Sequence, residues 1–193
     1  NTEFFTPSGK SFWCVSYEND KGESPSPIFV QDGGTLLSSQ LPDLTRDGYN
    51  FLGWYSGTTK VAAGSYKIQD DIILTAKWQL ESYPVSYNLN GGTNNSVNPS
   101  SYTIESSLID LKAPVKNNYD FAGWFVSESL IGRVVESIGG GTTGEITLYA
   151  KWNPTKYSIT YNLNGGTNAV ENPANYTVES KTIMLAVPQK EGY

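Results

Sequence analysis

A stretch of eight residues, Tyr-Asn-Leu-Asn-Gly-Gly-Thr-Asn, occurs twice in the chain, starting at Tyr87 and again at Tyr161. The match extends without gaps in both directions, so that 20 of 37 positions are identical between Tyr83–Tyr119 and Tyr157–Tyr193. Identity at this level, over a fixed offset of 74 residues, indicates tandem repeats. Such a chain folds as a series of similar small units and not around one large core.

A third, more diverged copy precedes these two. Tyr49–Tyr55 (YNFLGWY) resembles Tyr119–Phe125 (YDFAGWF), and Leu74–Trp78 (LTAKW) resembles Leu148–Trp152 (LYAKW). The two motifs recur in the same order in both copies, which a chance match would not explain. We therefore predict three units: repeat 1 at residues 1–80, repeat 2 at residues 81–154, and the N-terminal half of repeat 3 at residues 155–193.

The two complete copies differ in length after the Phe-x-Gly-Trp motif. The two tryptophans are 24 residues apart in the first copy (Trp54 and Trp78) and 28 apart in the second (Trp124 and Trp152). Because insertions concentrate in exposed loops, we expect a long loop within residues 127–144. A half-repeat would leave strand edges unpaired and a core face uncovered, so either the natural protein continues or this half docks onto the second repeat.

Apolar residues alternate with polar ones at the start of each copy, for example from Tyr83 to Leu89. A period of two predicts a half-buried strand, and Asn90-Gly91-Gly92 then ends it because Asn and Gly tolerate a positive φ. A short segment rich in Leu and Ile follows, too short for an ordinary helix. For the second repeat we predict strands at 83–89, 101–105, 119–125 and 146–152, with a single helical turn or an irregular crossover at 107–111.

The composition also favours strands, since the chain holds 13 Tyr, 7 Phe and 5 Trp but only one Met. A unit of about 70 residues buries little surface and is only marginally stable, and large aromatic side chains are one remedy. We interpret Trp54 and Trp124 as core anchors, and expect the glycine before each to let a neighbouring backbone or ring approach closely. The predicted fold class is mainly β, or α+β at most.

The motif Gly48-Tyr49-x-Phe51-x-Gly53-Trp54-Tyr55, followed by Leu74–Trp78, resembles the Listeria–Bacteroides repeat family, also called the internalin B-type B repeat. The resemblance covers nearly the whole chain from about Phe12. It implies tandem β-grasp-like repeats, each of about four strands with a short crossover. It further implies a segment of a secreted or cell-surface bacterial protein, for example one of the cell wall, that carries out no catalysis. The second copy departs from the family pattern, because Asn118 stands where Gly usually precedes Tyr.

The residue content argues against most enzyme classes. The chain has no His, which removes the Ser/His and Cys/His nucleophile systems, and we read the single cysteine, Cys14, as a half-buried strand residue. A Gly-rich segment, Gly139–Gly144, lacks the Lys of a phosphate-binding loop, so we read it as a flexible hairpin loop. Three carboxylate pairs stay conceivable as general acids or bases: Glu18 with Asp20, Asp43 with Asp47, and Asp70 with Asp71. Asp20, Asp32 and the Asn-rich turns stay conceivable as calcium ligands, although no regular acidic spacing supports this.

The expected partners follow from charge and patterning. A net charge of −6 makes nucleic-acid binding unfavourable, and no run of apolar residues is long enough to span a membrane. We predict no catalytic, cofactor-binding or metal-binding residues, and a location outside the cell or on its surface. Two functions stay open: a spacer that contacts neighbouring repeats of its own chain, or an adhesive module that binds a host protein or a glycan through exposed aromatic rings. The location of the Tyr and Trp side chains distinguishes them.

Overall fold

The computed structural model of the chain describes residues 9–20 and 22–192. Residues 1–8, which belong to the predicted repeat 1, and Tyr193, the counterpart of Tyr119, lie outside the described residues. Contacts divide the chain into two compact units, Asn1–Ser82 and Tyr83–Tyr193. The finer division into repeats at residues 1–80, 81–154 and 155–193 stays a prediction.

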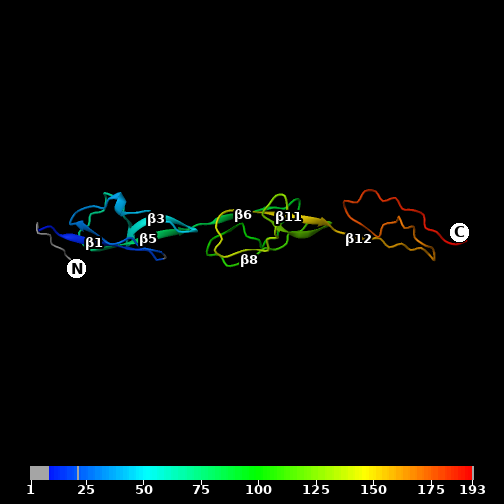
Figure 1. Cartoon of the computed structure of the whole chain (residues 1–193), viewed down its shortest axis with the longest axis horizontal. Coiled ribbons are helices and arrows are strands. Elements are labelled where there is room, and N and C mark those ends of the chain that lie inside the picture. The colour runs from blue at the N-terminus through cyan, green and yellow to red at the C-terminus, as the bar shows by residue number, and fades with distance from the viewer. Residues whose placement is uncertain (1–8, 21, 193) are drawn as a thin grey trace. The chain divides into compact units, whose positions relative to one another are not determined.

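The first unit holds one mixed sheet, with strands in the order β2-β1-β5-β3-β4. Figure 1 labels β1, β3 and β5 of this sheet. The strand β1 runs parallel to β5, and the other neighbouring pairs are antiparallel. Parallel neighbours require a crossover connection, and the short helix η1 lies on this one. The elements are β1 (Phe12–Glu18), β2 (Ile28–Gln31), η1 (Ser38–Gln40), β3 (Tyr49–Ser56), β4 (Thr59–Lys60) and β5 (Ile72–Leu80).

The second unit repeats this plan in a sheet of order β7-β6-β11-β9, with β6 parallel to β11. The pairs β8–β10 and β12–β13 form two small antiparallel sheets. The elements are β6 (Tyr83–Asn88), β7 (Ser101–Tyr102), β8 (Ile109–Asp110), β9 (Tyr119–Phe125), β10 (Ser137–Ile138), β11 (Ile146–Pro154), β12 (Tyr157–Ser158) and β13 (Asn175–Tyr176). The prediction of a mainly β chain, with tandem units of a few strands and a short crossover, is confirmed, and this order is consistent with the β-grasp-like repeat that the resemblance implies.

The strands of the second repeat differ from the predicted ones mainly at one place. The strand β9 has the predicted bounds, whereas β7 is shorter than expected. The segment 107–111 contains no helical turn, because β8 within it pairs with β10 and brings Ile109 opposite Ile138. The long loop predicted at 127–144 therefore folds back onto the crossover, and it contributes Ile138, only 3% exposed, to the core. The segment Gly139–Gly144 connects β10 to β11, which lie in different sheets, so the hairpin-loop reading was wrong.

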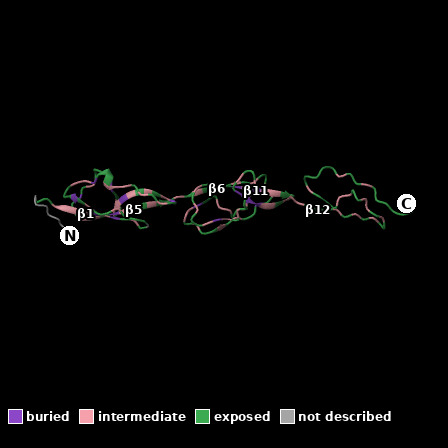
Figure 2. Cartoon of the chain, viewed as in Figure 1, coloured by how far each residue is buried: buried purple, intermediate pink, exposed green. Residues whose placement is uncertain are grey.

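The core of each unit is built on rings in mutual contact. Trp54 and Trp124 are 2% and 1% exposed, which confirms their interpretation as core anchors. Figure 2 shows buried residues near β5 and β11. The indole N–H groups of the two tryptophans donate hydrogen bonds to the carbonyl oxygens of Pro42 (2.8 Å) and Lys112 (3.3 Å). Ring centroids 5.0 to 5.7 Å apart connect, in order, Tyr17, Trp54, Phe51 and Trp78 in the first unit, and Tyr87, Trp124, Phe121 and Trp152 in the second.

A β-bulge explains how the Phe-x-Gly-Trp motif places both of its aromatic rings in the core. Phe51 and Trp54 are three positions apart, so in a regular strand they would face opposite sides of the sheet. Both nevertheless pack in the core, because the pairing of β3 with β5 shifts register between Phe51 and Gly53. One residue, Leu52, has no partner on β5, and the shift returns Trp54 to the core face. The same spacing places Phe121 and Trp124 against one core in the second unit.

The glycine before each tryptophan adopts a conformation that other residues rarely take. Gly53 has φ +117° and Gly123 has φ +126°. An added Cβ would lie 2.8 Å from Lys60 Cε at Gly53 and 2.7 Å from Val134 Cγ1 at Gly123. The expectation of a neighbouring backbone or ring was therefore wrong, because side chains approach here. The positive φ at the bulge is the stronger reason for glycine.

Candidate functional site

The aromatic side chains, which are the candidates for ligand binding, are nearly all buried or half-buried in the described part of the two complete repeats. Among the described residues up to Pro154, Phe29 is the only aromatic side chain in the exposed class, at 51%. The remaining rings in this part are buried or half-buried. No contiguous platform of exposed Tyr and Trp is therefore present in the described part of the two repeats.

The three repeated tyrosines use their hydroxyl groups to fix loops. Tyr17 donates a hydrogen bond to the carbonyl oxygen of Gln40, and Tyr87 and Tyr161 donate to those of Pro99 and Pro173 at 2.9 Å. Burial raises the pKa of Tyr17 and of Tyr87 above the ordinary tyrosine value, because the charged phenolate is poorly solvated there. Their repetition in the sequence thus follows from packing and loop anchoring.

The first carboxylate pairs considered as catalytic groups have structural roles. Asp71 accepts a hydrogen bond from the Cys14 backbone N–H, and Asp70 accepts one from the Asp71 N–H, both at 2.8 Å. Asp20 lies 3.8 Å from the Arg46 guanidinium. Cys14 itself is half-buried on β1, as predicted. These contacts engage Asp70 and Asp71 in backbone hydrogen bonds and Asp20 in an ion pair.

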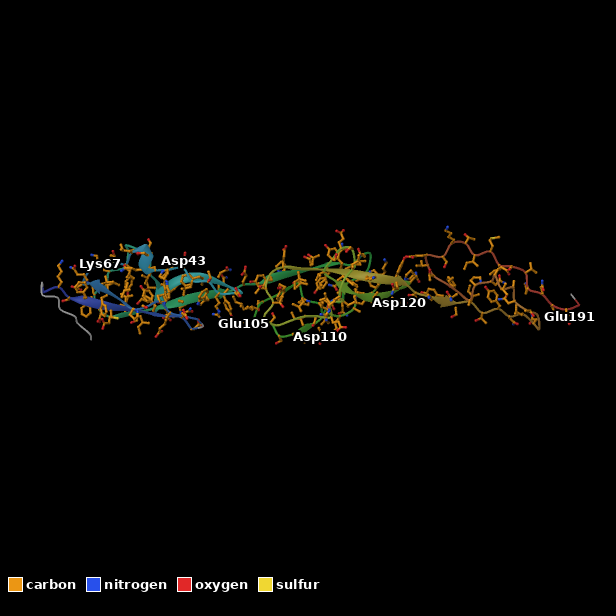
Figure 3. All side chains as sticks on the ribbon, viewed as in Figure 1. Asp43, Lys67, Glu105, Asp110, Asp120 and Glu191 are labelled. Atoms are coloured by element: carbon orange, nitrogen blue, oxygen red, sulfur yellow. The ribbon has the colours of Figure 1, made fainter. Side chains whose placement is uncertain are left out.

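A shallow depression in the first unit contains Asp43, which belongs to the remaining one of the three carboxylate pairs. It is lined by Asp43, with Leu52 and Lys60 among its neighbours, and Asp43 is the only carboxylate in that lining. Asp47 is exposed outside it. A glycosidase-type mechanism needs two carboxylates across one cleft. In the second unit the labelled Asp110 and Asp120 lie on separate strands (Figure 3).

One of the candidate calcium ligands has a structural partner. Asp32 accepts a hydrogen bond from the Trp13 indole N–H at 2.8 Å. Within residues 9–20 and 22–192, no group of three or more His, Cys, Asp or Glu side chains is placed to hold a metal ion. The described residues also contain no helix with the length and apolar character needed to cross a bilayer.

A junction between the second repeat and the half-repeat was not predicted from the sequence. The Thr155 backbone N–H donates to the Asn118 carbonyl (2.9 Å), and the Tyr157 hydroxyl donates to Asn118 Oδ1 (3.0 Å). The Tyr119 hydroxyl donates to Glu179 Oε1 at 3.0 Å. Asn118 has φ +65°, a conformation that Asn tolerates and Gly48 adopts in the first unit. The replacement of the usual Gly by Asn was the available signal, since it adds the acceptor that Tyr157 uses.

The connectors are short and bonded to the preceding repeat. Two residues separate β5 from β6, and two separate β11 from β12. In the first unit the Glu81 N–H donates to the Gly48 carbonyl at 2.9 Å, which is the counterpart of the bond from Thr155 to Asn118. Each connector therefore begins with a backbone hydrogen bond that extends the last strand of its own repeat.

The bond between Tyr119 and Glu179 predicts a measurable titration. The hydrogen bond to Glu179 raises the pKa of Tyr119, with smaller contributions from burial and from the Glu179 charge. Since the folded pKa is raised, the contribution of this bond is present below the ordinary tyrosine value of 10.0 and is lost as the pH rises through the raised pKa. We expect Glu179→Gln to lower the pKa of Tyr119 in an NMR titration of labelled tyrosine. Glu171→Gln, on the same half-repeat, should leave it unchanged, and equal shifts in both variants would contradict the bond.

Comparison with protein families gives matches over most of the chain. The model of the Listeria-Bacteroides repeat domain matches three segments, residues 13–77, 83–151 and 157–193. These segments correspond to the two complete repeats and to the half-repeat. The third match covers residues whose counterparts in the second repeat precede the Phe-x-Gly-Trp motif, so the family model recognises this part of the repeat without that motif.

Relatives are found in two bacterial species. A protein of Evansella cellulosilytica, provisionally named a Gly-rich membrane protein, is 31% identical over 186 residues, which cover 94% of this chain and 20% of the relative. A second protein of that species, provisionally named a membrane protein, is 28% identical over 184 residues, covering 94% and 27%. Internalin H of Listeria monocytogenes is 31% identical over 152 residues, covering 72% and 27%. The chain thus spans about a fifth to a quarter of the length of these relatives.

Proposed function

The chain belongs to the Listeria-Bacteroides repeat domain family, and from this membership we propose that it is a non-catalytic spacer within a secreted or cell-surface bacterial protein. In this role the repeats set the distance between other parts of the protein and a surface. The chain covers only a small share of each relative, which fits a segment repeated within a longer architecture.

One observation carries the spacer proposal. The aromatic residues that could form a binding platform are used to build the cores of the two complete repeats, and Phe29 is the only exposed one among the described residues up to Pro154. Exposed aromatic patches are a common sign of a binding surface. A repeat that keeps its rings buried or half-buried uses them for stability in a small domain.

The connectors support the same function. The backbone bonds of Glu81 to Gly48 and of Thr155 to Asn118 leave few freely rotating residues between repeats. A spacer that keeps two parts of a protein at a fixed distance requires stiff connections between its repeats, whereas flexible linkers are rich in Gly and Ser. The connectors Glu81-Ser82 and Thr155-Lys156 are two residues long and contain no Gly. Each follows directly on a strand.

The alternative function is an adhesive module that binds a host protein or a glycan. Its best support is a pair of exposed apolar side chains on the first sheet, Phe29 (51%) and Ile73 (53%). Both lie on strands that pair with β1. Two apolar side chains make a small surface compared with an ordinary protein interface, so the spacer is favoured. Loss of cell or glycan binding in a Phe29→Ala, Ile73→Ala variant would favour adhesion.

The spacer proposal predicts coupled motion of the two complete repeats. We expect backbone amide relaxation to report one common tumbling time for the amides of β3 and of β9. The matched control inserts a flexible Gly-Ser segment of about ten residues after Ser82, which should give each repeat its own, shorter tumbling time. Separate tumbling in the unmodified chain, or free bending in small-angle scattering, would count against a spacer that holds a distance.

A further inference from the structure

The first and last strands of each complete repeat are neighbours in the sheet and run parallel. In the first repeat, Val15–Glu18 of β1 pair with Ile72–Thr75 of β5. In the second repeat, Val85–Asn88 of β6 pair with Ile146–Tyr149 of β11. We name each of these the terminal-strand pair. It has four partner positions in both repeats, whereas the edge strand beside it has four residues in β2 and only two in β7.

The parallel direction decides how tension along the chain acts on this pair. Tension enters a repeat at the start of its first strand and leaves at the end of its last strand. In a parallel pair these two points lie at opposite ends, so the strands are pulled past each other and all of their hydrogen bonds are loaded together. If the terminal strands were antiparallel, the two points would lie at the same end, and the bonds would break one after another. Loss of several bonds in one step is the slower process, because a single barrier then contains all of them.

Tension reaches the pair without first extending a loop. In the second repeat it enters at Tyr83, two residues before the paired segment of β6, and leaves at Pro154, five residues after the paired segment of β11. From Ala150 to Pro154 the strand β11 stays paired with β9, so its end is held in the sheet. The connectors that lead into and out of this repeat are two residues long. The load therefore falls on strands and not on flexible chain.

Buried side chains shield one face of the pair from water. Val85 and Leu148 are buried in the second repeat, as Val15 and Leu74 are in the first. A backbone bond that opens in water is replaced by bonds to water, which makes opening cheap. Where apolar side chains exclude water, the same bond is electrostatically stronger and an unpaired group costs more. The terminal-strand pair thus combines simultaneous loading with protected bonds.

We propose that each complete repeat is a load-bearing unit, whose terminal-strand pair acts as a shear clamp against tension along the chain. This role goes beyond that of a spacer, because a spacer under no tension needs only stiffness. In the cell it rests on the proposed position of the chain between a surface and other parts of the protein. The resistance itself depends only on the fold of one repeat.

Optical tweezers can pull the second repeat in two directions within the full chain. Ser82→Cys with Lys156→Cys places the two handles at opposite ends of the terminal-strand pair, so the pair is sheared. Ser82→Cys with Glu145→Cys places both handles at the same end, because Glu145 directly precedes β11, so the pair is peeled open. The three side chains are exposed. Adding Cys14→Ser to both variants leaves the handle thiols as the only cysteines.

The clamp predicts a strong dependence on direction. Forced unfolding is governed by the unfolding rate, so the lifetime of the folded repeat at constant force is the quantity to compare. Shear must break about four bonds together, and each of the three bonds beyond the first slows opening about fivefold. At the same force, opening should therefore be on the order of 100-fold slower in shear than in peeling.

Unfolding in urea without force is the control. Both handle variants should unfold at the same urea concentration, because the clamp acts through direction and not through total stability. If Glu145→Cys is less stable, Thr143→Cys replaces it, since Thr143 is also exposed and precedes β11.

Equal lifetimes in the two directions, or a longer lifetime in peeling, would overturn the clamp. That outcome would leave a common tumbling time of the two repeats, and so the spacer, untouched. Separate tumbling of the repeats would count against the spacer, but it would not remove a difference between shear and peeling. The two proposals therefore fail on different measurements.

Discussion

Replacing Trp124 with alanine is expected to unfold the second repeat. The side chain is 1% exposed and contacts the rings of Tyr87 and Phe121, so its removal leaves a large cavity between the strands. Such a truncation costs about 3–5 kcal/mol. A domain has about 0.05–0.15 kcal/mol of stability per residue, so a repeat of this size has on the order of 4–11 kcal/mol in total. The loss is therefore a large part of the stability of the repeat.

The measurement is urea unfolding of the full chain, with amide exchange in β9 as a probe specific to the second repeat. Val126→Ala is the matched control, because Val126 lies two residues away and is 66% exposed. It should change the free energy of unfolding by no more than about 0.5 kcal/mol. If Trp124→Ala and Val126→Ala unfold at the same urea concentration, the assignment of Trp124 as the core anchor is wrong.

The sequence predicted the tandem organisation and most strands because both depend on local signals. Alternation from Tyr83 to Leu89 marks β6, and the positive φ values of Asn90 (45°) and Gly91 (85°) confirm the turn that ends it. The strand β9 coincides with the Phe-x-Gly-Trp motif because aromatic residues and glycine fix both its type and its position. The absence of His likewise restricted the possible chemistry without any structural information.

Other features could not be predicted because they depend on partners distant in the sequence. The pairing of β8 with β10 joins Ile109 to Ile138, and the sequence gives no indication that an inserted loop returns to the crossover. The bond between Tyr119 and Glu179 spans 60 residues and joins a half-buried tyrosine to an exposed glutamate. The inward direction of both Phe121 and Trp124 contradicts simple alternation, and only the bulge explains it.

The bulge itself predicts a second large effect, in the variant Gly123→Ala. Gly123 has φ +126°, and holding alanine in such a conformation costs about 1–3 kcal/mol. Its Cβ would also lie 2.7 Å from Val134 Cγ1, and overpacking adds about 1–3 kcal/mol. Together we expect a loss of at least about 2 kcal/mol from the free energy of unfolding of the second repeat. Gly139→Ala is the matched control, since its Cβ would contact only Thr142 Oγ1, at 3.7 Å.

A double-mutant cycle with Val134→Ala separates the two causes. Val134 is 46% exposed, so its truncation alone should be mild, and in the double variant it removes the atoms that an alanine at position 123 would strike. If packing causes most of the loss, the double variant recovers most of the stability. If backbone strain dominates, the loss persists, because the positive φ is imposed by the register shift that keeps Phe121 and Trp124 on one face. A Gly123→Ala variant as stable as Gly139→Ala would show that the bulge does not require glycine.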